Sequence, residues 1–238
     1  MLELGKKPLI ALPVNDKDFE ETIEKAVEKG VDIIELRIDQ FRDRNIDYIV
    51  DKVKYVKDKG LAALITVRSA KEGGTPISDY ERERIFKATA PLADILDIEL
   101  TSENLIKKVL KIAKENGAYG LISYHDFERT PSEEELQKII DKAASYGADI
   151  IKYAFKVESE EDVARIMCTT HKNRDKKLVA IGMGELGRIT RVAGFFFGSL
   201  ITYTYIGVSF APGQIELDKL KEELYFYGLI DKENEDAI

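Results

Sequence analysis

A lysine and a histidine are the residues best suited to covalent and acid–base chemistry, because each interrupts an apolar run. Lys152 lies within residues 149–157, where its neighbours are Ile, Tyr, Ala and Phe. A lysine enclosed by such side chains has a lowered pKa, and its neutral amine can attack a ketone or aldehyde to form a Schiff base. His125 lies near the end of residues 119–127, and histidine is the usual general acid and base near neutral pH. The plainer alternatives are a lysine paired with a carboxylate and a histidine with a structural role.

A triplet of charges ends the second apolar run of the chain. Glu35, Arg37 and Asp39 alternate with Leu36 and Ile38, so in a strand the charges share one face and the apolar residues share the other. Buried charges are costly unless they are paired. The triplet therefore predicts either a structural network of ion pairs or a clamp for a polar substrate.

Two further runs carry charge at comparable positions. Arg68 lies near the end of residues 61–69, before a glycine-containing loop that is either a lid or ordinary surface. Asp97 and Glu99 share one face of residues 95–100. We interpret these two acids as partners of the arginines rather than as catalysts.

Glycine-rich segments follow the last two apolar runs, at residues 182–187 and 211–214. In a parallel barrel, loops in this place often bind phosphate. Arg191, which lies between the two segments, offers another use, since a guanidinium can hold a carboxylate through a bidentate pair.

The elements that must position these residues form a repeating pattern of short apolar runs and longer charged amphipathic segments. The runs are residues 8–14, 32–39, 61–69, 95–100, 119–127, 149–157, 177–184 and 201–207. The helical segments are residues 16–30, 46–60, 78–93, 102–117, 132–147, 159–173, 186–198 and 215–228. Eight such units predict an α/β fold, a single (β/α)₈ TIM barrel over residues 1–238. The competing open, doubly wound sheet lacks the Gly-x-Gly-x-x-Gly fingerprint after its first strand.

Composition limits the classes of partner. The 238 residues include 36 basic and 44 acidic side chains, a net charge of −8 that argues against DNA or RNA binding. Cys168 is the single cysteine and His125 and His171 the two histidines, so neither an internal disulfide nor a cysteine or histidine metal site is expected. A disulfide between two chains through Cys168 is left open. The excess of Lys and Glu over Asn, Gln, Met and Cys is typical of a hyperthermophile.

One uncharged stretch, residues 192–215, is long enough to cross a bilayer. Its four glycines and one proline, with a strand-like centre, instead predict a buried helix end followed by a barrel strand. The apolar run at residues 9–14 is too short for the core of a signal peptide. We therefore expect no membrane contact and a location in the cytoplasm.

Taken together in this order, the residues at the predicted strand ends resemble the type I 3-dehydroquinate dehydratases. The resemblance covers essentially the whole chain. The matching segments are Glu35-Leu-Arg37-Ile-Asp39, Arg68-Ser-Ala-Lys-Glu72-Gly-Gly, Ser-Tyr-His125-Asp-Phe, Ile-Lys152-Tyr-Ala, Thr190-Arg191 and Ala211-Pro-Gly-Gln214.

The resemblance implies loss of water from 3-dehydroquinate to give 3-dehydroshikimate, without metal or organic cofactor. Lys152 would form a Schiff base with the substrate ketone, and His125 would remove the C2 proton and help the C1 hydroxyl to leave. Glu72 matches the carboxylate that orients this histidine, and Arg191 the partner of the substrate carboxylate. The remaining matches, which hold the ring hydroxyls and order the site, are Glu35, Arg37, Arg68 and Gln214.

This chain departs from the family pattern at three places. Phe210 stands where some relatives carry a serine, with Ser209 one position earlier, and whether either contacts substrate is open. No hydroxyl residue stands near Ala11, where some relatives have a serine. The segment before Pro8 is too short for a full N-terminal hairpin, so a plug at the barrel bottom would be short or absent. The loop after the eighth strand, with Gln214, is the expected lid.

Two other functions fit part of the pattern. A class I aldolase or transaldolase would share the barrel and the lysine imine, but would need a sugar-phosphate site. A barrel that only binds ligand would explain the arginines but not Lys152 beside His125.

The resemblance also implies a homodimer, and the aromatic segments 195–197 and 225–227 either cover its interface or pack in the core.

Overall fold

Parallel strands alternate with helices along the whole of residues 2–231, the part of the chain that the computed structural model describes. The strands are β1 (Leu9–Val14), β2 (Ile33–Arg37), β3 (Ala62–Thr66), β4 (Ile95–Glu99), β5 (Tyr119–Asp126), β6 (Ile150–Lys156), β7 (Leu178–Met183), β8 (Ile201–Tyr205) and β9 (Ile215–Glu216). The α-helices are α1 (Phe19–Glu28), α2 (Ile46–Asp58), α3 (Asp79–Thr89), α4 (Glu103–Glu115), α5 (Glu133–Ser145), α6 (Glu160–Lys172), α7 (Thr190–Phe197) and α8 (Leu217–Phe226). Three short 3₁₀ turns are η1 (Ile38–Gln40), η2 (Ala70–Glu72) and η3 (Leu186–Ile189).

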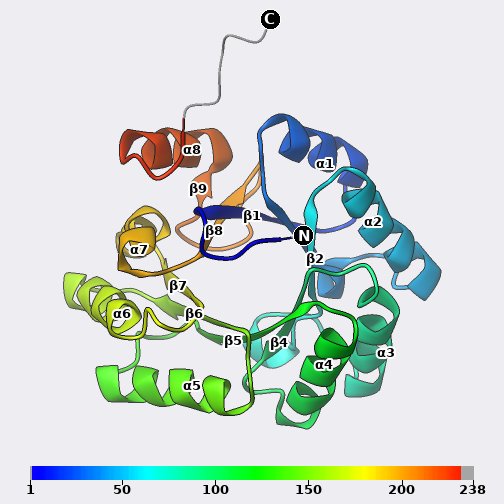
Figure 1. The fold of residues 1–238 in the computed structure, drawn as a ribbon, viewed down its shortest axis with the longest axis horizontal. Helices are drawn as coiled ribbons and strands as arrows, with labels where there is room; N and C mark the ends of the chain where they lie inside the picture. Colours follow the sequence, from blue (N-terminus) through cyan, green and yellow to red (C-terminus); the bar gives the residue numbers. More distant parts are fainter. Residues whose placement is uncertain (1, 232–238) are drawn as a thin grey trace, which may run out of the picture.

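The strands curl into a barrel with the helices outside it (Figure 1). Their order is β7-β6-β5-β4-β3-β2-β1-β8-β9, and every pair is parallel. The seam between β7 and β8 is closed by a single bridge from Leu178 to Ser199 and by the Leu200 N–H, which donates to the Leu178 carbonyl at 2.8 Å. The predicted barrel is therefore confirmed, and the alternative of an open, doubly wound sheet is wrong.

Most helix boundaries follow from local sequence. Ser132 and Ser159 each form a capping box with the acidic residue three positions later. Ser102, at the N-terminus of α4, makes no such capping bond. Its hydroxyl donates instead to Glu99 Oε2 at 2.8 Å. The same hydroxyl accepts from Arg82 Nη1 at 3.0 Å, so Ser102 belongs to the network around Glu99 and not to the helix cap.

The two last predicted helices differ in detail from the structure. Residues 186–198 divide into η3 and α7. The expected helix at residues 215–228 begins only at Leu217, because Ile215–Glu216 form β9 and pair with β8. The Glu216 side chain then caps α8 by accepting from the Asp218 and Lys219 N–H groups. The uncharged stretch at residues 192–215 is a helix end followed by β8, as predicted. Within residues 2–231, no helix is long and apolar enough to cross a membrane.

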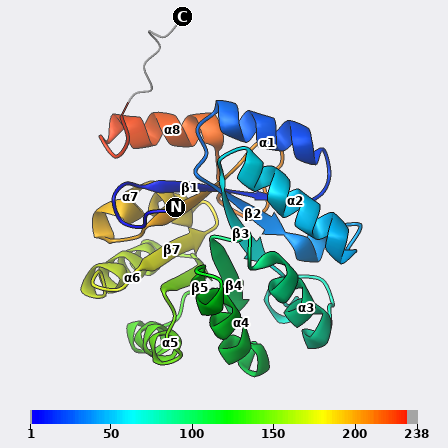
Figure 2. The same ribbon diagram turned by 45° about the vertical axis from the view of Figure 1, so that its right-hand side comes forward.

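The barrel interior is apolar at one end and polar at the other, and this division positions the site. Apolar residues from the early parts of the strands fill the lower barrel, among them Leu9, Ile33 and Ile150. Leu2 and Leu4 pack against this cluster, so the N-terminal plug is present but short. A second, larger cluster fills the space between strands and helices, which ring the barrel on every side (Figure 2).

Candidate active site

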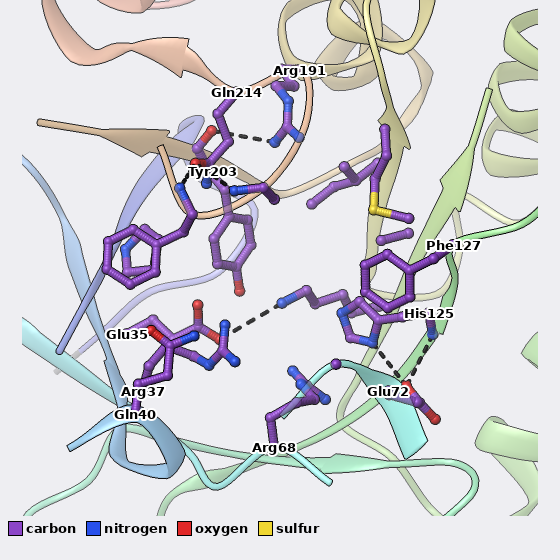
Figure 3. Close-up of a pocket in the computed structure, with 18 residues that line it drawn as sticks. Glu35, Arg37, Gln40, Arg68, Glu72, His125, Phe127, Arg191, Tyr203 and Gln214 are labelled. Carbon is purple, nitrogen blue, oxygen red and sulfur yellow. Dashed lines mark hydrogen bonds and ion pairs between the residues drawn. The ribbon is translucent and has the colours of Figure 1, made fainter. Parts of the chain in front are cut away.

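The inward-facing positions change from apolar to charged toward the carboxyl ends of the strands. On β2, Ile33 is part of the apolar layer and Glu35 lies one step above it; on β6, Ile150 and Lys152 have the same relation. The side chains of these upper positions line one pocket at the mouth of the barrel (Figure 3). All eight predicted site residues line this pocket: Glu35, Arg37, Arg68, Glu72, His125, Lys152, Arg191 and Gln214.

Lys152 reaches into the pocket from β6 with its side chain 5% exposed. Its Nζ lies 3.8 Å from Glu35 Oε1 and 3.7 Å from Asp97 Oδ2, too far for hydrogen bonds but close enough for attraction. Burial lowers the pKa of Lys152, and Arg68 adds to the lowering, whereas the two carboxylates oppose it. The net result is a lowered pKa, which favours the neutral amine that a nucleophile requires.

His125 and Glu72 form a pair on the neighbouring side of the pocket (Figure 3). The His125 Nδ1 and the His125 backbone N–H lie 2.9 and 3.0 Å from Glu72 Oε2. The Thr101 hydroxyl donates to Glu72 Oε1 at 2.5 Å. The tautomer that carries its proton on Nδ1 donates to this carboxylate and keeps a lone pair on Nε2.

Burial acts on both members of the pair. It raises the pKa of Glu72 to about 7, although the Thr101 hydrogen bond and Arg68 oppose the rise. It lowers the pKa of His125 well below 6.5, and Arg68, Lys152 and Arg37 lower it further. Near neutral pH His125 is therefore neutral and able to act as a base, and Glu72 is the member of the pair that takes up a proton.

Arg68 is bound by acids from the neighbouring strand. Its Nη2 donates to Asp97 Oδ2 at 2.9 Å, and its Nη1 donates to Glu99 Oε1 at 3.2 Å and to the Ser123 hydroxyl at 2.7 Å. Arg82, from α3, donates to the other oxygen of Glu99 at 2.5 Å. Arg68 lines the pocket, yet most of its donors serve this buried network.

The charges on β2 divide between the pocket and its wall. Arg37 ends the strand, and its Nε and Nη2 donate to the two carboxylate oxygens of Asp39 at 3.0 and 2.8 Å. Asp39 lies in η1, is 1% exposed and does not line the pocket. Glu35 accepts from the Thr66 hydroxyl at 2.8 Å. Within the triplet, Asp39 forms an ion pair with Arg37 away from the pocket, whereas Glu35 and Arg37 line the pocket. The prediction of an ion-pair network and the prediction of a polar clamp therefore each describe some of the three residues.

Arg191 is buried at the start of α7 with no carboxylate partner among residues 2–231. Its guanidinium donates to backbone carbonyls only: Nε to Gly213 at 2.8 Å, Nη2 to Pro212 at 3.3 Å and Nη1 to Tyr203 at 3.4 Å. Burial lowers the pKa of Arg191 to about 10, and the nearby Arg188 adds to the lowering. A buried cation without a protein anion is suited to a carboxylate or phosphate ligand.

The loop between β8 and β9 closes one side of the pocket. Gln214 Oε1 accepts from the Phe210 N–H at 2.7 Å, the Ala211 N–H at 3.2 Å and the Ser209 hydroxyl at 3.0 Å. Gln214 therefore holds the loop in its curved shape as well as lining the pocket. Phe210 also lines the pocket, whereas Ser209 is exposed and bonds within the loop.

Tyr203, like Gln40, is a polar pocket residue that sequence reasoning missed. It lies on β8 at an inward-facing position, above Ile201, and its ring faces the amine of Lys152. The alternation of residues 201–205 was the signal that would have found it, since Ile201 and Tyr203 share a face. No group of three His, Cys, Asp or Glu side chains in residues 2–231 is placed to hold a metal ion.

Comparison with known proteins agrees with the geometry. Residues 10–231 match the family model described as type I 3-dehydroquinase. The 3-dehydroquinate dehydratase of Aquifex aeolicus is 44% identical over 90% of this chain and 96% of its own. That of Methanocaldococcus jannaschii is 41% identical over 90% of this chain and 96% of its own.

Solved structures give the same result. The crystal structure of the Aquifex aeolicus dehydratase superposes with a TM-score of 0.87 at 41% identity, covering 93% of this chain and 100% of that one. A type I 3-dehydroquinate dehydratase from Clostridium difficile, described as covalently modified with comenic acid, has a TM-score of 0.88 at 29% identity and covers 95% of each chain.

Proposed function

Because this chain belongs to the type I 3-dehydroquinase family and so is a lyase of the shikimate pathway that dehydrates 3-dehydroquinate, we propose that it does so through a Schiff base on Lys152. The observation that carries the proposal is a buried lysine with a lowered pKa in the same pocket as a histidine–carboxylate pair. A sugar-phosphate aldolase and a barrel that only binds ligand are not supported by the family match.

The reaction begins at the amine. Neutral Lys152 Nζ adds to the C3 ketone carbon, and the carbinolamine that forms loses water to give an iminium ion. The iminium withdraws electrons and acidifies the C2 proton. His125 Nε2 removes that proton to give an enamine. The enamine electrons then expel the C1 hydroxyl, which leaves as water with the proton from His125. Water finally hydrolyses the conjugated iminium, releasing 3-dehydroshikimate and the free amine.

Glu72 assists His125 at both proton transfers. Its carboxylate fixes the ring through Nδ1 and stabilises the imidazolium that exists between the two steps. Thr101 holds the other carboxylate oxygen, so the Glu72 side chain has one orientation.

In this proposal the other predicted residues bind the substrate or order the site around it. Arg191 exchanges a loop carbonyl for the substrate carboxylate, while Glu35 and Arg37 bind ring hydroxyls. Arg68 orders the acids around Lys152, and Gln214 shapes the loop that covers the ring. The covalent modification described for the Clostridium difficile relative supports a nucleophile in a pocket of this kind.

Borohydride trapping tests the Schiff base. The protein is incubated with 3-dehydroquinate and reduced, and the modified peptide is mapped by mass spectrometry. We expect an adduct on Lys152 and a loss of turnover of about 10⁴-fold or more in Lys152→Ala.

Lys156→Ala is the matched control for this experiment. Lys156 lies on the same strand, but its side chain is 46% exposed and pairs with Glu158, so neither trapping nor turnover should change. Turnover without any adduct on wild-type Lys152 would overturn the proposed mechanism.

We further propose a homodimer from a thermophilic source. Exposed aromatic residues on α7 and α8, such as Phe196 and Phe226, support the dimer. Ion pairs that link neighbouring helices support heat stability, for example Lys108–Glu83 at 2.7 Å and Lys142–Glu103 at 2.7 Å. A cytoplasmic location stays a prediction from the sequence.

A further inference from the structure

Tyr203 carries a buried hydroxyl for which residues 2–231 supply no hydrogen-bond partner. The residue is 4% exposed and lines the pocket described above. Burying a hydroxyl without a hydrogen bond is unfavourable, and a phenylalanine would fill the same space without that cost. The hydroxyl is buried and without a partner in this structure, so a ligand that reaches it gains a hydrogen bond that the described residues leave unmade.

The surroundings of Tyr203 define which kind of partner fits. Lys152 Nζ lies 4.1 Å from the centre of the ring, so the amine faces the ring and not the hydroxyl. The phenol oxygen projects from the ring edge toward Glu35 (Figure 3). Burial raises the pKa of Tyr203 well above 10, and the carboxylates of Glu35 and Asp97 add to the rise. The phenol thus keeps its proton and is available as a donor.

The reacting carbon fixes how a substrate ring must lie. If C3 is bonded to Lys152, C2 and C4 lie on either side of it. His125, on β5, has to face C2 in order to remove its proton. In the closed barrel, β6 and β7 lie between β5 and β8, and Figure 3 shows Tyr203 and His125 on opposite sides of the pocket. C4 therefore points toward the side that carries Tyr203 and Glu35.

We propose that Tyr203 is a specificity-determining residue whose hydroxyl donates a hydrogen bond to the oxygen of the C4 hydroxyl of 3-dehydroquinate. The proton of that C4 hydroxyl is directed at the Glu35 carboxylate, which is an acceptor. The C4 hydroxyl then accepts from one side chain and donates to the other. This role rests on the proposed Schiff base at Lys152, which sets the position of C3.

The test combines Tyr203→Phe with a substrate analogue that lacks only the C4 hydroxyl. Tyr203→Phe keeps the ring facing Lys152 and removes only the phenol oxygen. With 3-dehydroquinate, we expect its KM to rise about five- to tenfold with little change in kcat. With the 4-deoxy analogue, whose affinity is measured as inhibition of the 3-dehydroquinate reaction, wild type and Tyr203→Phe should be equal.

Thr202→Val is the matched control. The Thr202 hydroxyl is another buried group without a partner among the described residues, one position earlier on β8, but it does not line the pocket. Its removal should leave KM unchanged. Thermal unfolding of each variant checks that the fold is intact.

Two results would overturn the role of Tyr203. One is an unchanged KM in Tyr203→Phe. The other is an equal loss of affinity for 3-dehydroquinate and for the 4-deoxy analogue, which would mean that the phenol acts on the structure and not on C4. Trapping of wild-type Lys152 with 3-dehydroquinate is measured beforehand, so a failure of the Schiff base is recognised separately.

Discussion

At the scale of single residues, the pairing of Glu72 with His125 determines which proton the active site carries. Burial favours the neutral form of both side chains, and the cations around His125 further oppose its charged form. A carboxylate beside an imidazole favours the imidazolium, and the imidazolium favours the carboxylate. Glu72, whose pKa is raised to about 7, is thus the member of the pair that takes up a proton near neutral pH.

Replacement of Glu72 by Gln should separate the two members. The amide can still accept from His125, but it cannot stabilise a positive ring. What remains around His125 is burial and the cations Arg68 and Lys152, all of which lower its pKa. We expect the wild-type pair to take up a proton near pH 7, the value to which burial raises the pKa of Glu72. In Glu72→Gln, His125 should stay neutral to well below pH 6.5, and kcat should fall by about 10²-fold.

The measurement is the ¹⁵N chemical shift of the histidine rings as a function of pH. The chain has only two histidines, and His171→Gln removes the exposed one, so the signal of His125 is unambiguous. A His125 ring whose ¹⁵N titration is the same in Glu72→Gln as in wild type would show that the carboxylate does not set the pKa of His125.

The active site shows which residues and contacts could be predicted from the sequence and which could not. All eight predicted residues line the pocket. Residue type and strand position predicted six of them, whereas Glu72 and Gln214 were predicted from the family resemblance.

Residue type and strand position also predicted that Asp97 and Glu99 pair with an arginine, and both bind Arg68, but they did not reveal that Ser123 of β5 binds the same guanidinium. Tyr203 was missed because an aromatic residue in a strand is usually packing, and only the pocket makes its hydroxyl exceptional.

At the scale of elements, the loop between β8 and β9 is anchored by Arg191, by Gln214 and by the short strand β9. Arg191 binds the carbonyls of Pro212 and Gly213, and Gln214 binds the N–H groups of Phe210 and Ala211. The family resemblance predicted a lid here, but it did not predict how the loop is anchored. The short strand β9, which fixes the end of the loop, exists only because Ile215 pairs with Thr204 of β8; its sequence alone resembles the start of α8.

Gly213 is the position where this loop is most sensitive to substitution. Its φ is +75°, and a Cβ there would lie 2.2 Å from the Gly184 carbonyl oxygen. Gly213→Ala must therefore push the loop away from β7 and withdraw two carbonyls from Arg191. We expect the KM for 3-dehydroquinate to rise at least about tenfold, and chymotrypsin to cleave after Phe210 faster than in wild type.

Gly207→Ala provides the control at the other end of the loop. Gly207 has nearly the same φ, +74°, but a Cβ added there would meet no atom within 4 Å. Only backbone strain of about 1–2 kcal/mol is expected there. If both variants raise KM equally, the clash with Gly184 is not what positions the loop.

At the scale of the whole molecule, large apolar side chains are exposed on one part of the helical ring. Phe196 on α7 is 59% exposed, Phe226 at the end of α8 is 78% exposed, and Ile189 just before α7 is 50% exposed. The two helices are neighbours on the outside of the barrel (Figure 1). The sequence left open whether these aromatic segments are core or interface; their exposure in a single chain favours an interface.

A charge placed in this surface should dissociate the proposed homodimer. Phe226→Glu puts a carboxylate where the partner chain would bury an aromatic ring, so we expect the dimer dissociation constant to rise by roughly 10²-fold. Sedimentation velocity over a range of concentrations measures this dissociation constant.

Tyr80→Glu is the matched control, because Tyr80 is 73% exposed on α3, away from α7 and α8. A monomeric wild type, or equal weakening by both substitutions, would mean that the α7–α8 surface is not the dimer interface. Since the pocket of one chain contains all eight predicted site residues, the monomeric variant should keep the wild-type KM at concentrations where it is fully dissociated.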